Sequence, residues 1–95
     1  MKREILNPEE LSDALERLDD WTIDAGVLRK SYKFKNFAEA LRFVNQVGAL
    51  ADAADHHPDL ELGFGYARMA LTTHDRGGIT DVDIGLAASI DRLEA

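Results

Sequence analysis

The residues with the clearest chemical potential are the three histidines of the chain, which fall in one short region. His56 and His57 stand side by side before Pro58, and His74 lies inside the run Thr72-Thr73-His74-Asp75. Because histidine titrates near neutral pH, such a cluster indicates either proton transfer or metal binding. The plainer alternative is that all three are exposed polar residues around a loop.

Helices must position these residues, and three helix starts can be read from the sequence. Each start is an N-cap side chain with an acidic residue three positions on: Asn7 with Glu10, Asn36 with Glu39, and Thr80 with Asp83. Apolar periodicity extends the first helix to about Asp19 and the second to about Ala54. In the second helix, Phe37, Leu41 and Val44 begin an apolar face that Phe43 and Leu50 widen. A face this wide fits either a well-buried central helix or one that also contacts another subunit.

Strand signals fill the intervals between these helices. Residues 21–23, 27–34, 60–62 and 66–74 are predicted strands, with turns at 24–26 and 63–65. The order α-β-β-α-β-β-α predicts an α+β fold, a four-stranded antiparallel sheet with helices packed on one face. We expect one domain over residues 1–95. The basic run Arg29, Lys30, Lys33 and Lys35 is interpreted as a solvated strand with lysines that oppose aggregation.

The second predicted hairpin brings distant histidines together. With its turn near Phe64-Gly65, the strand that ends at His74 returns beside the Asp55-His56-His57 segment. Asp52 precedes His56 by four residues, a spacing that places its carboxylate next to the His56 ring and favours the protonated imidazole. His57 precedes a proline and should be extended, with its ring turned away from that of His56. His74 is expected on the open side of the sheet.

Three interpretations of the cluster remain at this point. Exposed polar residues around a loop are the first. A zinc site with three histidine ligands is the second, but adjacent residues in an extended chain diverge and are poor joint ligands. General acid–base catalysis is the third and is favoured, because it needs two titratable groups near neutral pKa on either side of a small polar substrate.

Composition narrows the class of partner. The chain has 95 residues and a formal net charge of −7, so nucleic acid and anionic membrane surfaces are disfavoured as partners. It contains no cysteine, which excludes disulfides and thiolate metal sites. No stretch is typical of a signal peptide or a membrane span, and a soluble cytoplasmic protein is expected. A domain this small is often only marginally stable alone, which makes an oligomer plausible.

The motifs together resemble a known family. Asp52-x-x-x-His56-His57-Pro58, followed by Thr73-His74-x-x-Gly77-Gly78-Ile79-Thr80 and Asp83, resembles the pterin-4a-carbinolamine dehydratase family over nearly the whole chain. The resemblance implies the same α-β-β-α-β-β-α fold and a homodimer or homotetramer. It also implies dehydration of a 4a-hydroxytetrahydropterin to the quinonoid dihydropterin, without a metal or redox cofactor. This reaction recycles the pterin used by aromatic amino-acid hydroxylases.

Site residues follow from the resemblance position by position. It implies acid–base roles for His56 and His74, and a role for His57 in holding the pterin ring. Further pocket positions are implied at Asp52, Asp55, Thr72, Thr73 and Asp75. Some relatives in the family act in transcription, so the alternative function is an interaction protein that stabilises a partner's oligomer.

Overall fold

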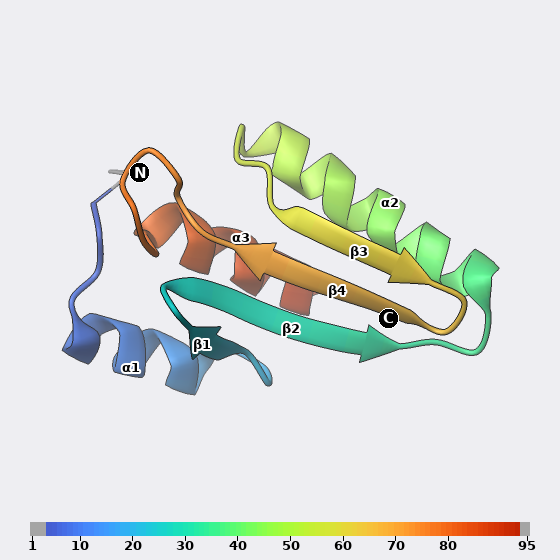
Figure 1. The fold of residues 1–95 in the computed structure, drawn as a ribbon, viewed down its shortest axis with the longest axis horizontal. Helices are drawn as coiled ribbons and strands as arrows, with labels where there is room; N and C mark the ends of the chain where they lie inside the picture. The colour runs from blue at the N-terminus through green and yellow to red at the C-terminus, as the bar shows by residue number, and fades with distance from the viewer. Residues whose placement is uncertain (1–3, 94–95) are drawn as a thin grey trace.

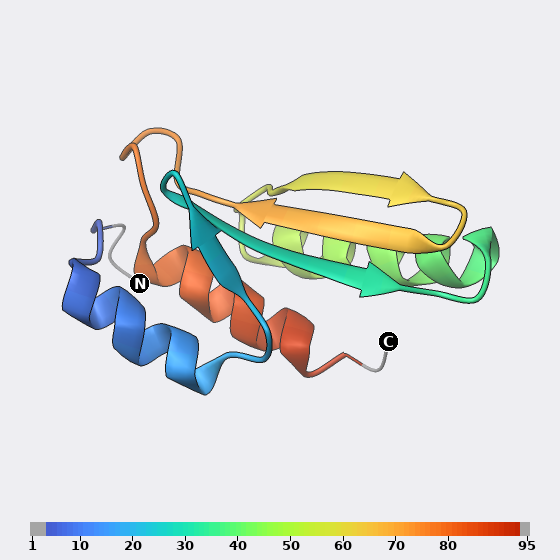
Figure 2. The same cartoon turned by 60° about the horizontal axis from the view of Figure 1, so that its bottom comes forward.

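The computed structural model describes residues 4–93, which form a sheet covered on one face by helices (Figures 1 and 2). The elements are α1 (Pro8–Arg17), β1 (Thr22–Asp24), β2 (Val27–Lys33), α2 (Phe37–Ala53), β3 (Asp59–Gly63), β4 (Tyr66–Leu71) and α3 (Asp81–Asp91). Every strand pair in the sheet is antiparallel. The predicted α+β fold is therefore confirmed.

The sheet has the strand order β1-β2-β4-β3, so β2 and β4 lie in its interior. Each hairpin closes through two residues. Ala25 and Gly26 join β1 to β2 with φ of 51° and 76°, the left-handed conformation that a type I′ turn requires. Phe64 and Gly65 join β3 to β4, where the turn was predicted.

All three helices begin at the predicted N-cap residues. The Asn7 side chain accepts a hydrogen bond from the Glu10 amide at 2.8 Å, and the Glu10 carboxylate accepts one from the Asn7 amide at 2.9 Å. Asn36 caps α2 by accepting from the Glu39 amide, and Thr80 begins α3 with its own capping box. Local side-chain chemistry therefore determines where the helices start.

The core lies between the sheet and the helices. Leu28, Met69 and Leu71 point from the sheet into it, where they meet Phe43 and Val47 of α2. The opposite face of the sheet is polar and open, as the alternating burial of β2 and β4 shows. Within residues 4–93, no helix combines the length and the apolar character needed to cross a membrane.

One expectation about α2 needs correction. The row that faces the core is Ala40, Phe43, Val47 and Ala51, all buried. Phe37 and Leu41, with which the apolar face was expected to begin, remain 45% and 39% exposed. The apolar surface of α2 therefore has two parts, one covered by the sheet and one left open.

Lys30 also departs from its expected place on a solvated strand. Its side chain is only 7% exposed. The ammonium group lies 3.0 Å from the Asp91 carboxylate at the end of α3 and 4.6 Å from the centre of the Tyr32 ring. Burial lowers the pKa of Lys30, but hydrogen bonding with Tyr32 and Asp91 raises it by more, so the pKa lies above 10.5. A paired lysine can thus occupy the core side of the sheet.

Candidate active site

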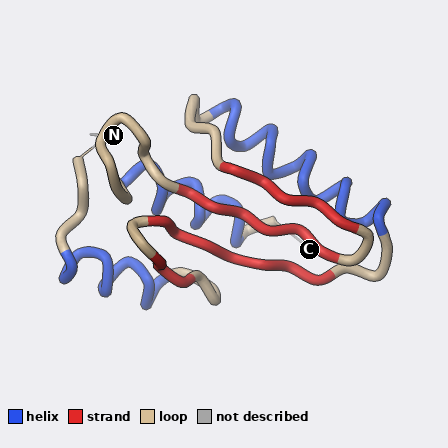
Figure 3. Tube along the Cα trace, in the orientation of Figure 1, coloured by secondary structure: helices blue, strands red, loops and turns tan. Residues whose placement is uncertain are grey.

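Asp83, in the first turn of α3, is the centre of a buried hydrogen-bond network. Its Oδ2 accepts from the Thr80 amide at 2.9 Å and from the Thr73 hydroxyl at 2.8 Å. Its Oδ1 is bonded to Nε2 of His56. The hydroxyl of Thr80 lies 2.9 Å from that of Thr73. One carboxylate therefore joins α3 to the loops that follow α2 and β4, which meet at the same end of the sheet (Figure 3).

The direction of these hydrogen bonds follows from the chemistry of the groups. An ionised carboxylate can only accept, so His56 donates its Nε2–H to Asp83 and Thr73 donates its hydroxyl hydrogen. The hydroxyl of Thr80 then donates to Thr73. In a neutral His56 ring held this way, Nδ1 is the nitrogen that can take up a proton.

The end of α2 explains why His56 is buried. The amide of Asp55 donates to the carbonyl of Asp52 at 3.1 Å, and the amide of His56 donates to that of Ala51 at 3.1 Å. This bonding pattern is a Schellman motif, with Asp55 in the left-handed conformation at φ 51°. The motif turns the chain sharply, and the His56 side chain ends only 6% exposed.

Asp52 does not contact the histidine that sequence spacing predicted. Its Oδ1 lies 2.9 Å from Nε2 of His57, and both side chains are largely exposed. The four-residue rule holds only inside a helix, whereas α2 ends at Ala53, before His56. The rings of His56 and His57 do diverge as expected, one buried and the other 63% exposed.

His74 lies in a turn beyond the strand that was expected to contain it. β4 ends at Leu71, and the Thr73 amide donates to the Gly78 carbonyl at 2.9 Å to close a tight loop. Gly77 takes the left-handed conformation in this loop, with φ of 75°. His74 and Asp75 are exposed, and the loop leaves His74 at the end of the open face of the sheet.

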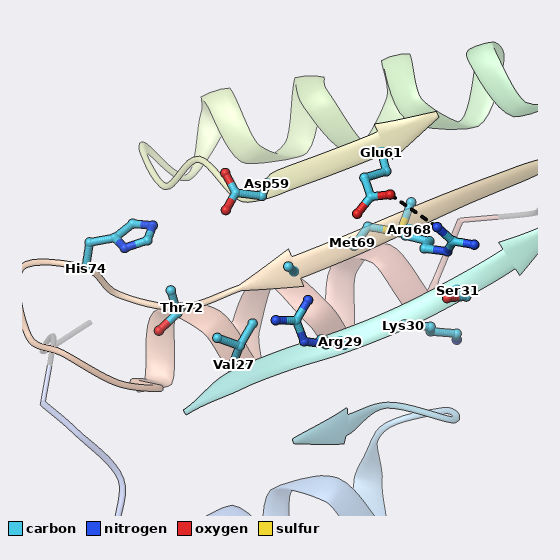
Figure 4. A pocket seen from close by; sticks show the side chains of 11 residues that line it. Val27, Arg29, Lys30, Ser31, Asp59, Glu61, Arg68, Met69, Thr72 and His74 are labelled. Atoms are coloured by element: carbon cyan, nitrogen blue, oxygen red, sulfur yellow. Dashed lines mark hydrogen bonds and ion pairs between the residues drawn. The ribbon is translucent and has the colours of Figure 1, made fainter. Parts of the chain in front are cut away.

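A hollow of about 240 Å³ occupies that open face, and His74 stands at one end of it (Figure 4). Thr72 lines it near His74, while Arg29 and Asp59 line it from β2 and β3. The Thr72 hydroxyl donates to the Gly26 carbonyl at 3.0 Å. The hollow therefore combines apolar surface with several polar side chains and has a histidine at its edge, the kind of place where small ligands bind.

The sequence-predicted site residues fall into two groups. His56 and Thr73 belong to the buried network, and the Thr73 hydroxyl is fully engaged there. The second group is exposed and comprises Asp52, Asp55, His57, His74 and Asp75, with Thr72 partly covered. The network links the His56 and His74 segments, but of the three histidines only His74 lines the hollow. Among residues 4–93, no three potential ligands are grouped to hold a metal ion.

Sequence reasoning missed three residues of this site. Asp83 was recognised only as the capping-box partner of Thr80. Its second carboxylate oxygen bonds His56, which lies 27 residues away, and the sequence gives no sign of this contact. Arg29 was interpreted only as part of a solvated basic run and Asp59 was not singled out, because they belong to different strands that are not neighbours in the sheet. Their only signal was a polar side chain on the outward-facing parity of each strand.

Known proteins similar to this chain in sequence share one description. The sequence model described as pterin 4 alpha carbinolamine dehydratase matches residues 4–93. A Metallosphaera sedula protein, provisionally named a pterin-4-alpha-carbinolamine dehydratase, is 44% identical over 89 residues, covering 94% of this chain and 93% of its own length. A Chloroflexus aurantiacus protein with the same provisional name is 40% identical over 88 residues, covering 93% of this chain and 95% of its own length.

A solved structure agrees with the sequence matches. The crystal structure of a transcriptional coactivator/pterin dehydratase from Brucella melitensis superposes with a TM-score of 0.86 at 32% identity. The match covers 92% of this chain and 95% of that one.

Proposed function

The chain belongs to the pterin-4a-carbinolamine dehydratase family, and we propose that it is a hydro-lyase that removes water from a 4a-hydroxytetrahydropterin. The product is the quinonoid dihydropterin. The observation that carries this proposal is the placement of an exposed His74 beside Thr73, whose hydroxyl shares the Asp83 carboxylate with His56. In the family's pathway, the reaction recycles the pterin cofactor of aromatic amino-acid hydroxylases.

The chemistry requires two proton transfers. The hydroxyl on C4a leaves as water once it has received a proton, and the N5–H proton is removed as the C4a=N5 double bond forms. No atom other than those of water is lost. A protonated and a neutral imidazole can carry out both steps near neutral pH, and a positioned acid or base is typically worth about 10²–10⁴-fold in rate.

The structure supports distinct roles for the three histidines. His74 is exposed at the hollow and is the group we assign to direct proton exchange with substrate. His56 is held by Asp83 with Nδ1 left to exchange a proton, so it is the second acid–base candidate. His57 is oriented by Asp52 and is the group we propose to hold the ring, and the family resemblance adds Asp55, Thr72 and Asp75 as further pocket positions.

Kinetics with purified variants tests the proposal. Dehydration of chemically generated 4a-hydroxytetrahydropterin is followed for wild type, His74→Ala and His56→Ala, with Arg42→Gln on the exposed side of α2 as the control. We expect each histidine variant to lose about 10²–10⁴-fold in kcat/KM and the control to match wild type. Equal rates in all four proteins would refute acid–base catalysis by these residues.

One observation favours a second function, that of an interaction protein. Phe37 and Leu41 leave an apolar surface on α2 that nothing in residues 4–93 covers. We propose that this surface mediates self-association into a homodimer or homotetramer. The same surface could serve a different protein in a chain without dehydratase activity, and the kinetic test above separates these functions.

A further inference from the structure

We propose that the hollow beside His74 receives the substituent on C6 of the pterin, and that Arg29 selects a substituent carrying a negative charge. This inference rests on the proposed function. It assigns a specificity-determining residue and a substrate class, namely tetrahydropterins whose C6 group ends in a carboxylate or a phosphate.

The connectivity of the pterin ring places the substituent. C6 is bonded directly to N5, the atom that must lose its proton in the dehydration. A histidine that exchanges a proton at N5 must come within hydrogen-bond reach of it. We assign His74 to this proton, so the C6 substituent begins two bonds beyond N5, the atom that His74 would contact, and the hollow is the space that His74 borders (Figure 4).

The register of the sheet creates the hollow. Ala70 of β4 pairs with Arg29 of β2 on one side and with Asp59 of β3 on the other. These three residues form one row across the open face, with the smallest side chain at its centre. Neighbouring strands are about 4.8 Å apart, so the backbones of Arg29 and Asp59 are separated by roughly 10 Å. A small group can enter above Ala70, between a cation and an anion.

Among residues 4–93, Arg29 is the one lysine or arginine lining this hollow whose charged group has no partner. Arg68 also lines it, but its guanidinium lies 3.2 Å from Glu61 and stacks on the Tyr66 ring. Lys30 is paired with Asp91 on the core side. Within the part of the chain that the structure describes, Arg29 has neither an ion pair nor a side-chain hydrogen bond.

An unpaired arginine at this place has no evident structural role. β2 is an interior strand, so Arg29 does not guard a sheet edge against aggregation. The chain as a whole is acidic, with 18 Asp and Glu against 11 Lys and Arg, so it repels anions in general. A guanidinium offers paired donors that match a carboxylate or a phosphate. Its position on the wall of the hollow gives an anionic group a local partner.

Fluorescence titration with pterins tests the assignment. The ligands are 6-hydroxymethylpterin, which is neutral at C6, its phosphate ester, and 6-carboxypterin. The proteins are wild type, Arg29→Gln, and Arg42→Gln as a charge-matched control away from the hollow. We expect wild type and the control to bind at least one anionic ligand about tenfold more tightly than the neutral one. Arg29→Gln should bind all three alike, and the preference should shrink as salt is added, since Arg29 is exposed.

The outcomes separate this inference from the function on which it depends. Tight binding of all three ligands with no preference in wild type would overturn the role of Arg29 and leave the dehydratase proposal standing. A preference for anionic pterins that persists in Arg29→Gln would also overturn the role of Arg29. If wild type bound none of the pterins, the assignment of the hollow would be overturned, and the kinetic test above would still decide the dehydratase proposal. The choice between phosphate ester and 6-carboxypterin reports which anion the hollow accommodates.

Discussion

At the scale of single residues, Asp83 has two structural roles, one at the start of α3 and one at the His56 ring. It completes the capping box of α3 through Oδ2, and it holds the His56 ring through Oδ1. A buried carboxylate is costly unless its oxygens are hydrogen-bonded, and here three donors satisfy it. We therefore infer that folding of the α3 start and orientation of His56 are linked.

The variant Asp83→Asn tests both roles of this carboxylate, capping α3 and holding the His56 ring. An amide has one oxygen and one NH₂ group, so at least one of the three donors loses its acceptor. We expect the free energy of unfolding to fall by about 2 kcal/mol in chemical denaturation. Loss of ring orientation should lower kcat roughly ten- to a hundredfold with little change in KM. Nitrogen NMR should show that His56 no longer holds a single Nε2–H tautomer.

Asp81→Asn is the matched control for that experiment. Asp81 lies in the same first turn of α3, so its substitution removes the same charge from the same helix terminus. Its buried Oδ1 has no hydrogen-bond partner among the described residues, and it does not contact His56. If Asp81→Asn reduced kcat as much as Asp83→Asn, the helix dipole rather than the His56 contact would be responsible.

At the scale of elements, the far end of α3 has its own acceptor, the partly buried Asp91. Asp91 accepts from the Trp21 indole at 2.8 Å, from the Asp19 amide at 2.9 Å and from Lys30 at 3.0 Å. These bonds attach α3 to the segment after α1 and to β2. Burial raises the pKa of Tyr32 above 10.0, and hydrogen bonding raises that of Lys30 above 10.5 against the opposing effect of burial.

These two pKa shifts predict a loss of stability in alkali. Each group holds its proton more tightly when folded, so its contribution is complete below about pH 10 and is lost as pH rises through the raised pKa. We expect the free energy of unfolding of wild type to fall steeply above pH 10, and that of Lys30→Met to fall less steeply. Urea denaturation between pH 8 and 11 measures both slopes. Lys33→Met, on the exposed face of β2, should keep the wild-type slope.

The elements also show what local sequence can and cannot predict. Helix starts and two-residue turns were predicted correctly because they depend on residues within four positions of each other. The Asp52–His56 contact was wrong because the left-handed Asp55 ends the helical geometry on which the spacing rule depends. The strand expected to reach His74 stops at Leu71 because Thr73 pairs instead with Gly78 in its own loop.

At the scale of the whole molecule, the hollow was beyond sequence prediction for a topological reason. The Arg29–Ala70–Asp59 row exists because β4 lies between β2 and β3. Predicted strands alone do not give their order in a sheet. It was easier to predict that the two histidine segments lie close together, because they flank a single hairpin and the glycine pattern located its turn.

The exposed row of α2 gives the last prediction, about assembly. Phe37 and Leu41 are one helical turn apart on a face that the sheet does not cover, and Val44 and Gly48 continue that row, half-buried. Burying the part of each side chain that is still exposed, 45% of Phe37 and 39% of Leu41, is worth about 1 kcal/mol for each in each subunit. A 10.5 kDa domain buries only a modest core of its own, so an interface of this size matters to its stability. We expect light scattering to give a multiple of this mass for wild type and for Gln46→Glu, and the monomer mass for Leu41→Glu. Monomeric wild type at micromolar concentration would show that this surface does not mediate self-association.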